Sequence, residues 1–238
     1  MDRSDQWMVG YYERVMKCAA RHRLFVDMHG SYTPKGLCRT YPNLLTYEGV
    51  LGMEQGARCK PENSNWLPFI RNAVGPMDFT PGSMFSAQPE DNRSTGANPM
   101  GTGTRAYQMA LYVVSESPLQ MPADNPVLYR REHLCTEFLA AVPTTWDSLR
   151  VCGREVVVAR RKGDKWYVGG ITNDRSYTTE IALDFLPAGR TFTKTSFEDG
   201  VNADLQATDY RKRVREVDAS TVVKVEMVRN GGWAAVIE

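Results

Sequence analysis

The spacing of apolar residues along the chain changes near residue 145. Before that point, apolar side chains recur at three- and four-residue spacing or form short unbroken runs, which are typical of helices and of strands buried on both faces. A helix is expected over residues 5–22. The run from Leu24 to Val26 continues into Asp27-Met28-His29-Gly30, which predicts a short buried parallel strand with a polar tip that ends at glycine.

The pattern in the rest of the first part is less regular. The expected elements are helices over residues 105–116 and 132–142, strands within 69–79 and 118–124, and a loop rich in Asn, Gly, Ser and Thr over 88–103. Only three or four core strands result, whereas a (β/α)8 barrel needs eight strands and about 250 residues. Two interpretations are open: a smaller α/β sheet, or a chain that starts in the middle of a barrel domain.

After residue 145, apolar and polar residues alternate, as in strands that are buried on one face. Residues 155–161 and 165–171 flank Lys162-Gly163-Asp164, which is a hairpin signal. Further strands are expected over residues 177–185, 190–197, 221–228 and 233–237. Short strands separated by turn residues predict an antiparallel β-sandwich. The sequence therefore predicts an α/β domain over residues 1–145 and a β-sandwich over residues 146–238.

The composition is that of an ordinary globular protein. Hydrophobic residues make up 42% of the chain and charged residues 24%, and the net charge is +1. So small a charge argues against a nucleic-acid or anionic-membrane partner. No apolar run approaches the roughly 20 residues of a membrane helix, and the N-terminus has no apolar signal core. The five cysteines are widely spaced without a CxxC pair, which predicts isolated thiols.

Several polar residues are of the types that carry chemistry in enzymes. Glu48 and Glu54 lie six positions apart, and glycoside hydrolysis uses two carboxyl groups. Asp27 and His29 are two apart, so on a strand their side chains point the same way and can bind a divalent metal or hold a sugar hydroxyl. Asp78 follows another apolar stretch. Each also has a plainer explanation: solvated helix glutamates, a structural hydrogen-bonded pair, and a turn-forming aspartate.

Longer segments of the sequence point to a family. They are FVDMHGSYTPKGLCRTYPNLLTYEGVLGME at residues 25–54, LPFIRNAVGPMDFTPGSM at 67–84, YVVSESPLQMPAD at 112–124, CTEFLAAVPTTWDSLRV at 135–151, VVVARRKGDKWYVGGIT at 156–172 and the terminal GGWAAVIE. The run from Pro34 to Asn43 is long and particular. Together these segments cover nearly the whole chain and resemble glycoside hydrolase family 97.

The resemblance implies a protein of three parts: an N-terminal β-sandwich, a (β/α)8 barrel and a C-terminal β-sandwich that supports oligomerisation. Residues 1–145 correspond to the second half of the barrel, and residues 146–238 to the C-terminal sandwich. The expected fold class is therefore α/β plus all-β. This agrees with the low strand count of the first part, and it implies that Met1 is an internal methionine of a longer protein.

The resemblance also implies roles for individual residues. Glu54 corresponds to the catalytic acid, and Glu48 and Glu54 correspond to carboxylates that bind a calcium ion beside the substrate. Calcium takes six to eight oxygen ligands, so its other ligands would come from elsewhere. His29 and Asp78 are predicted to bind the substrate, which is an oligosaccharide.

One position separates the two mechanisms of the family. In inverting members a glutamate follows the histidine of this motif, whereas here Gly30 follows His29. This resembles the retaining members, which act as α-galactosidases and use an aspartate nucleophile. In similar sequences that aspartate lies directly before the Met-Asp-Arg that corresponds to residues 1–3. We therefore expect a retaining exo-α-galactosidase, with α-glucosidase as the second choice, truncated and inactive as the 238-residue chain alone.

Other interpretations remain open. The chain can be a non-catalytic fragment that acts as an assembly or carbohydrate-binding module, with homo-oligomers formed through the C-terminal sandwich. Alternatively, the coding start is misassigned. Full-length members of such families are expected to be periplasmic or secreted, although no signal peptide is present in this chain.

Overall fold

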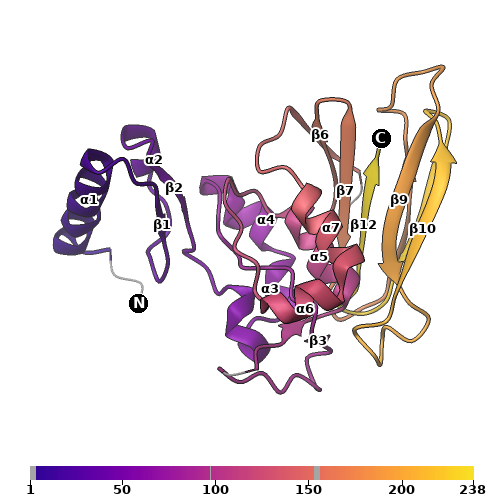
Figure 1. Cartoon of the computed structure of the whole chain (residues 1–238), viewed down its shortest axis with the longest axis horizontal. Coiled ribbons are helices and arrows are strands. Elements are labelled where there is room, and N and C mark those ends of the chain that lie inside the picture. Colours follow the sequence, from indigo (N-terminus) through magenta and orange to yellow (C-terminus); the bar gives the residue numbers. More distant parts are fainter. Residues whose placement is uncertain (1–3, 97, 153–155) are drawn as a thin grey trace.

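The computed structural model describes residues 4–96, 98–152 and 156–238. Figure 1 shows an N-terminal arm at the left, a mainly helical region in the middle and a β-sandwich at the right. None of the helices in the described part is long and apolar enough to span a bilayer. The five cysteines are free thiols, as predicted.

The N-terminal arm consists of a helix and two short parallel strands. Its elements are α1 (Gln6–Arg21), β1 (Val26–Met28), α2 (Leu37–Thr40) and β2 (Leu44–Tyr47). Asp5 caps α1, because its side chain accepts a hydrogen bond from the Met8 backbone N–H at 3.1 Å. The strands pair in parallel, and Met16 and Met28 lie in a small core with Leu44 and Tyr47. The predicted first helix and first strand are both confirmed.

The middle region is mainly helical. Its elements are η1 (Met53–Arg58), α3 (Pro61–Ser64), α4 (Leu67–Ile70), η2 (Asn72–Val74), β3 (Ser86–Ala87), β4 (Gly101–Thr102), α5 (Arg105–Val114), α6 (Pro126–Arg131) and α7 (His133–Ala141). β3 and β4 form a second parallel pair, separate from β1 and β2. The helices predicted over residues 105–116 and 132–142 are confirmed as α5 and α7.

Two strand predictions in the middle region were wrong. The segment 69–79 begins within α4 and η2, because a proline in the first turn of α4 favours a helix start. Only Met77 in this segment forms a bridge, which is parallel to Tyr47. Residues 118–124 form no ladder in the described chain, and Pro118 and Pro122 lack the N–H group that a ladder needs.

The C-terminal part is the predicted antiparallel β-sandwich. Its strands are β5 (Ser148–Val151), β6 (Val156–Lys162), β7 (Lys165–Ile171), β8 (Tyr177–Ala182), β9 (Phe192–Asp199), β10 (Tyr210–Val217), β11 (Val222–Met227) and β12 (Gly232–Ile237). The larger sheet has the order β10-β9-β12-β7-β6-β5, and β11 pairs with β8 in a smaller sheet. The predicted hairpin is β6–β7, although residue 155 lies outside the described residues. Apolar residues of both sheets form the core between them.

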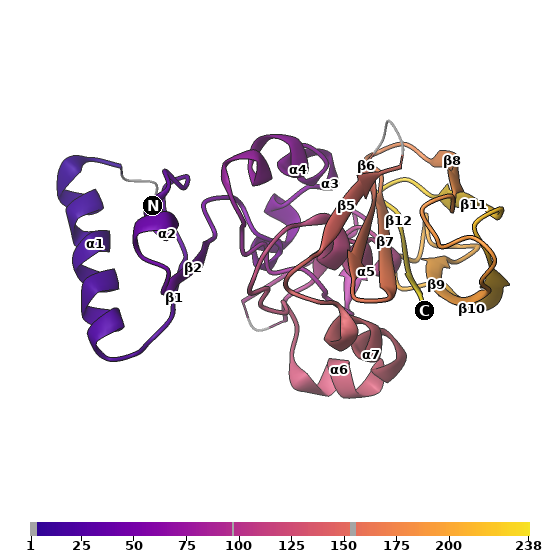
Figure 2. The same cartoon turned by 90° about the horizontal axis from the view of Figure 1, so that it is seen from above.

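Helix α5 packs between the middle region and the β-sandwich. All ten of its residues are buried, and it packs on β7 and β12 of the larger sheet (Figure 2). Glycines in these strands permit the close approach: a Cβ at Gly232 would lie 2.4 Å from the Tyr107 Cα, and one at Gly169 would lie 2.9 Å from the Ala110 carbonyl oxygen. One hydrophobic core therefore contains residues from both sides of residue 145.

Candidate functional site

The candidate catalytic residues gather where neighbouring parallel strands end. Asp27 lies in β1, His29 follows β1, Glu48 follows β2, and Asp78 follows the bridge at Met77. Carboxyl ends of parallel strands meet at one edge of a sheet, and in α/β proteins with parallel strands this edge is where sites are built. Two groups form there: Asp27 with His29 and Asp78, and His29 with Glu48 and Glu54. Within each group the ligand atoms lie within 4.8 Å of one another.

Glu54 reaches this edge because the chain reverses after β2. Its backbone N–H donates to the Thr80 hydroxyl oxygen at 3.2 Å, that hydroxyl donates to Glu54 Oε2, and the Gln55 amide donates to Oε1 at 3.1 Å. Gly52 leaves room for this arrangement, since a Cβ there would lie 2.3 Å from Glu54 Oε2. The two glutamates thus converge although they share neither one strand nor one helix.

Glu48 is held by the backbone of Gly30 and by the side chain of Arg71. Its Oε2 accepts a hydrogen bond from the Gly30 N–H at 2.6 Å. Its carbonyl oxygen accepts from Arg71 Nη2 at 3.2 Å, and the same guanidinium donates to the carbonyls of residues 47, 75 and 76. Arg71 is only 5% exposed, and burial lowers its pKa to about 10. It therefore fastens the end of β2 to the segment that carries Asp78.

Sequence reasoning missed both Arg71 and Thr80. For Arg71 a signal existed, because it is a lone cation in the apolar context LPFIRNAV. Thr80 gave none. Its φ of 51° is rare for a β-branched residue, and strain of this kind concentrates at functional sites. Its backbone N–H donates to Asp78 Oδ1 at 3.2 Å while its hydroxyl holds Glu54, so it links the two groups.

His29 and Asp78 form a pair in which only the imidazole reaches solvent. His29 Nε2 lies 2.8 Å from Asp78 Oδ2, and 34% of the His29 side chain is exposed. Asp78 has no exposed surface, and its Oδ1 also accepts the backbone N–H of Met121 at 3.1 Å. The structure thus places Asp78 behind His29, where it reaches the edge only through the imidazole.

Burial and mutual contact shift the pKa values of the acidic groups. Burial and the neighbouring Asp78 raise the pKa of Asp27 to about 7. Burial and Glu54 raise the pKa of Glu48. Burial also acts to raise the pKa of Glu54, but hydrogen bonds from Glu48, Thr80 and Gln55 outweigh it and lower that pKa. The pKa values of the two glutamates are therefore shifted in opposite directions, that of Glu48 upward and that of Glu54 downward.

The donor set of this edge suits a cation. Glu48 and Glu54 converge with carboxylate oxygens, which are the ligands that calcium and magnesium prefer. Two carboxylates supply fewer than the six to eight oxygens of a calcium shell. The nitrogen of His29 suits transition metals better. The residues present thus fit part of a calcium site.

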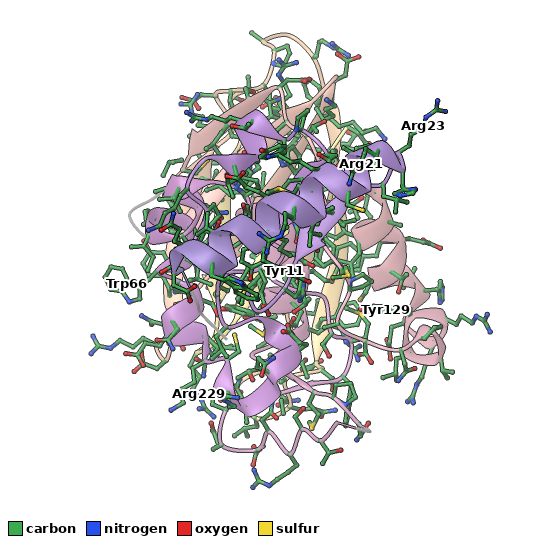
Figure 3. All side chains as sticks on the ribbon, turned by 90° about the vertical axis from the view of Figure 1, so that its left-hand side faces the viewer. Tyr11, Arg21, Arg23, Trp66, Tyr129 and Arg229 are labelled. Carbon is green, nitrogen blue, oxygen red and sulfur yellow. The ribbon has the colours of Figure 1, made fainter. Side chains whose placement is uncertain are left out.

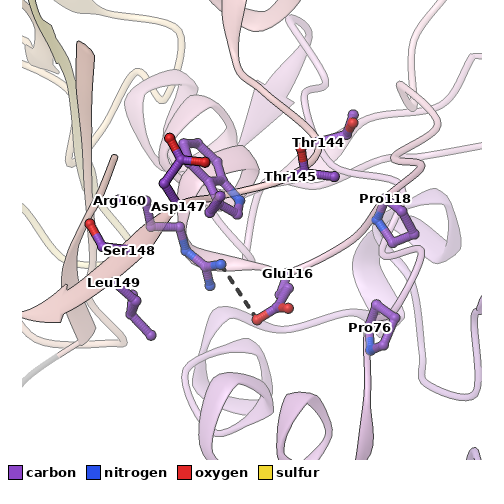
Figure 4. Close-up of a pocket in the computed structure, with 10 residues that line it drawn as sticks. Pro76, Glu116, Pro118, Thr144, Thr145, Asp147, Ser148, Leu149 and Arg160 are labelled. Atoms are coloured by element: carbon purple, nitrogen blue, oxygen red, sulfur yellow. Dashed lines mark ion pairs between the residues drawn. The ribbon is translucent and has the colours of Figure 1, made fainter. Parts of the chain in front are cut away.

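A separate hollow lies where the middle region meets the sandwich (Figure 4). It has a volume of about 450 Å³ and includes none of the clustered acids. Arg160 Nη1 lies 3.5 Å from Glu116 Oε2 within it, and the Arg160 guanidinium lies 5.7 Å from the Trp146 ring centroid. Arg160 contacts residues of the middle region and of the sandwich, so this hollow is part of the junction between these two regions.

Known proteins resemble the chain at both ends. Residues 1–50 match the family model Glycoside hydrolase 97, and residues 145–238 match Glycosyl-hydrolase 97 C-terminal, oligomerisation. A retaining alpha-galactosidase of Bacteroides thetaiotaomicron is 41% identical over 247 residues, which is 100% of this chain and 37% of that protein. A probable retaining alpha-galactosidase of Streptomyces bingchenggensis is 32% identical over 240 residues, which is 99% of this chain and 35% of that protein.

Solved structures agree with the sequence matches. A family 97 enzyme from Pseudoalteromonas sp. strain K8, in complex with acarbose, superposes with a TM-score of 0.86 at 36% identity, over 98% of this chain and 37% of that one. A β-arabinopyranosidase superposes with a TM-score of 0.75 at 28% identity, over 94% of this chain and 36% of that one. Carboxyl groups at parallel strand ends beside a β-sandwich, with these matches, define a glycoside hydrolase architecture. The chain belongs to glycoside hydrolase family 97, and it spans just over a third of the length of these relatives.

Proposed function

We propose that the chain provides the acid/base part of a retaining exo-α-glycosidase that acts on the non-reducing ends of oligosaccharides. The observation that carries this proposal is the position of Glu54: its carboxyl group is partly exposed and held by Thr80 and Gln55 beside Glu48. The two relatives described above are named a retaining alpha-galactosidase and a probable retaining alpha-galactosidase, which favours α-galactosides over α-glucosides as substrates.

In this proposal residues 1–145 form the second half of a (β/α)8 barrel. Two parallel strand pairs and the parallel bridge at Met77 support it. Large apolar side chains on the arm and around α4 also support it, because exposed apolar surface is typical of contact sites. Trp7 and Trp66 are each 62% exposed and Phe25 is 72% exposed. Figure 3 looks onto α1, with Trp66 projecting outward at the edge.

Glu54 would protonate the glycosidic oxygen while a carboxylate nucleophile attacks the anomeric carbon, and would then take a proton from water. The hydrogen bond from Glu48 must break before Glu54 can carry the proton, because it now stabilises the ionised form. His29 would hold a sugar hydroxyl, oriented by Asp78. By resemblance the nucleophile is an aspartate that directly precedes the Met-Asp-Arg motif at residues 1–3.

A calcium ion would be held by Glu48 and Glu54, with the rest of its shell from water or from other polypeptide. When bound, it would supply a fixed positive charge that holds a sugar hydroxyl. Gly30, Thr80 and Arg71 would keep the two glutamates in place for it.

A chimera tests this proposal. The part of the Bacteroides relative that precedes the aligned region is fused to this chain, and turnover of aryl α-galactosides and α-glucosides is measured. We expect turnover of the galactoside, its loss in Glu54→Gln, and its retention in Glu62→Gln, a matched change in α3. A folded chimera that cleaves neither substrate, or that keeps its activity in Glu54→Gln, would contradict the assignment.

A second candidate function is self-association through residues 146–238. The description of the matching family model as an oligomerisation domain supports it. Light scattering over a range of concentrations is the test, and a constant mass of 26.8 kDa would contradict it. For the full-length protein we propose a periplasmic or secreted location, as the resemblance implies.

A further inference from the structure

The two sheets of the sandwich differ in size, and this leaves part of one inner face uncovered. β11 and β8 form the smaller sheet, whereas β10 and β9 lie at the far edge of the larger one (Figures 1 and 2). Residues 211, 213 and 215 share one face of β10 and stand opposite residues 198, 196 and 194 of β9. A groove of about 440 Å³ lies between this face and β11.

Most of the charges in this groove are positive. Its lining includes five cations and three carboxylates: Lys194, Arg211, Arg213, Arg215, Lys224, Glu198, Glu216 and Glu226. Arg213 Nε pairs with Glu198 Oε2 at 3.2 Å, and Lys224 pairs with Glu226 at 2.5 Å. Within the described residues, Lys194, Arg211 and Arg215 form no ion pair with a carboxylate. The groove therefore has a surplus of unpaired cations.

Lys194 is the least expected of these cations, since it is only 4% exposed. Its ammonium donates to the Ser196 hydroxyl at 3.4 Å and lies 5.2 Å from the Trp233 ring centroid. The Ser196 hydroxyl is itself engaged as a donor to Glu198. An ammonium buried without a carboxylate is costly, because it has lost its water and gained little in return.

A second cation of the groove, Arg211, also has a buried donor that is not satisfied by any described residue. Arg211 Nε is buried and has no hydrogen-bond partner in the part of the chain that the structure describes. Native proteins seldom leave such groups unsatisfied, and one explanation is a missing ligand. An oxyanion that enters the groove would give Lys194 a counter-charge and Arg211 Nε an acceptor, and Arg guanidinium groups match the geometry of such oxyanions.

We propose that this groove is a second carbohydrate site, which binds a sugar residue that carries a carboxylate or a sulfate group. Lys194, Arg211 and Arg215 bind the oxyanion, and the carboxylate of Glu198 accepts a hydroxyl group of the same sugar. The volume lies within the range of about 300–1,000 Å³ of small-ligand pockets. None of these residues belongs to the acidic cluster around Glu54, so the site does not depend on the proposed hydrolase function.

Calorimetry on the intact chain tests the proposal, with trigalacturonate, neutral galactotriose and inorganic phosphate as the probes. We expect trigalacturonate to bind, neutral galactotriose not to bind, and phosphate to bind more weakly. Arg211→Gln and Arg215→Gln should each weaken trigalacturonate binding at least about tenfold, which corresponds to 1.4 kcal/mol. If one variant does not fold, the other still tests the site.

Lys212→Gln is the matched control. It removes the same charge from the same strand, but Lys212 lies on the opposite face, over the Phe197 ring. An equal loss of affinity in Lys212→Gln would show that binding depends on the overall positive charge of the strand. That result would overturn the proposed site. Equal binding of galactotriose, or binding of phosphate alone, would overturn the acidic sugar as ligand. A change in molecular mass of the Arg211 or Arg215 variants would instead assign the groove to contact between copies of the chain.

Discussion

The imidazole of His29 lies 2.8 Å from the carboxylate of Asp78, although 49 positions separate them in the sequence. Asp78 is closed to solvent and accepts the backbone N–H groups of Thr80 and Met121. Its position is therefore fixed by the backbone, so it acts as a rigid acceptor that orients the imidazole. An arrangement of this kind selects which ring nitrogen carries the proton.

Replacement of Asp78 by Asn should change the tautomer of His29. In the native chain we expect the neutral imidazole to carry its proton on Nε2, because a carboxylate oxygen at 2.8 Å accepts a hydrogen bond there. The new amide would keep its oxygen for the two backbone donors and turn its N–H towards His29, which favours a proton on Nδ1. Side-chain ¹⁵N spectra at about pH 9 measure this. Glu137→Gln on α7 is the control, and an unchanged His29 spectrum in Asp78→Asn would contradict the prediction.

Calcium affinity should depend on both clustered glutamates. Glu48→Gln and Glu54→Gln each remove a charged oxygen ligand, so each should weaken binding by at least about tenfold, and the double variant should lose it. Titration calorimetry with calcium chloride is the measurement. Glu62→Gln should bind as the native chain does. Equal affinity in all variants would place any calcium site elsewhere.

Two adjacent glycines in β7 should respond differently to alanine. A Cβ at Gly169 would lie 2.9 Å from both the Ala110 carbonyl oxygen and Val113 Cβ of α5. We expect Gly169→Ala to lower the free energy of unfolding by about 2 kcal/mol, because overpacking displaces the helix. Gly170 faces the other side, where the nearest atoms would lie at 3.4 Å, so Gly170→Ala should cost far less. Urea unfolding of both variants measures this difference. An equal loss in the free energy of unfolding would refute the packing argument.

The buried carboxyl of Asp199 should make stability depend on pH. Burial raises its pKa to about 7, against hydrogen bonds from the Thr104 hydroxyl and the Val228 and Gly232 N–H groups. A carboxyl with a folded-state pKa above its unfolded value of 3.8 binds more protons when folded. Its contribution to stability is therefore full below about pH 4 and is lost as the pH rises through about 7.

Denaturant unfolding at several pH values measures this contribution as a difference between variants. Asp199→Asn should flatten the decline in stability between about pH 4 and pH 7. Asp164→Asn removes an exposed carboxyl from the β6–β7 turn and should leave the native slope. Identical slopes in the native chain and in Asp199→Asn would show that Asp199 is ionised throughout.

The spacing of apolar residues and of turn residues in the sequence predicted the elements that are stabilised by local interactions. The spacing of apolar residues marked α1, and the turn at Lys162-Gly163-Asp164 marked the β6–β7 hairpin. β10 was missed because its sequence, YRKRVREV, is mostly charged, and its arginines lie on the inner face that β11 and β8 do not cover. Apolar alternation cannot reveal a strand whose inner face is polar.

The candidate site was predicted only in part, for a related reason. The spacing between Glu48 and Glu54 can be read along the chain, but the chain reversal that brings them together cannot. That reversal depends on Gly52 and on Thr80, which lies 26 positions beyond Glu54. The family resemblance identified the candidate site residues. The residues that hold them in place, Arg71 and Thr80, became evident only from the structure.

Helix α5 has a consequence for how such proteins change over evolutionary time. Its side chains complete the core of the region before residue 145 and also cover the larger sheet of the sandwich. A genetic exchange that joined this sandwich to a foreign domain would leave β7 and β12 facing an unmatched helix, with Gly169 and Gly232 opposite side chains of the wrong shape. We therefore expect exchange at residue 145 to be selected against, and α5 and the sandwich to be inherited together as one unit.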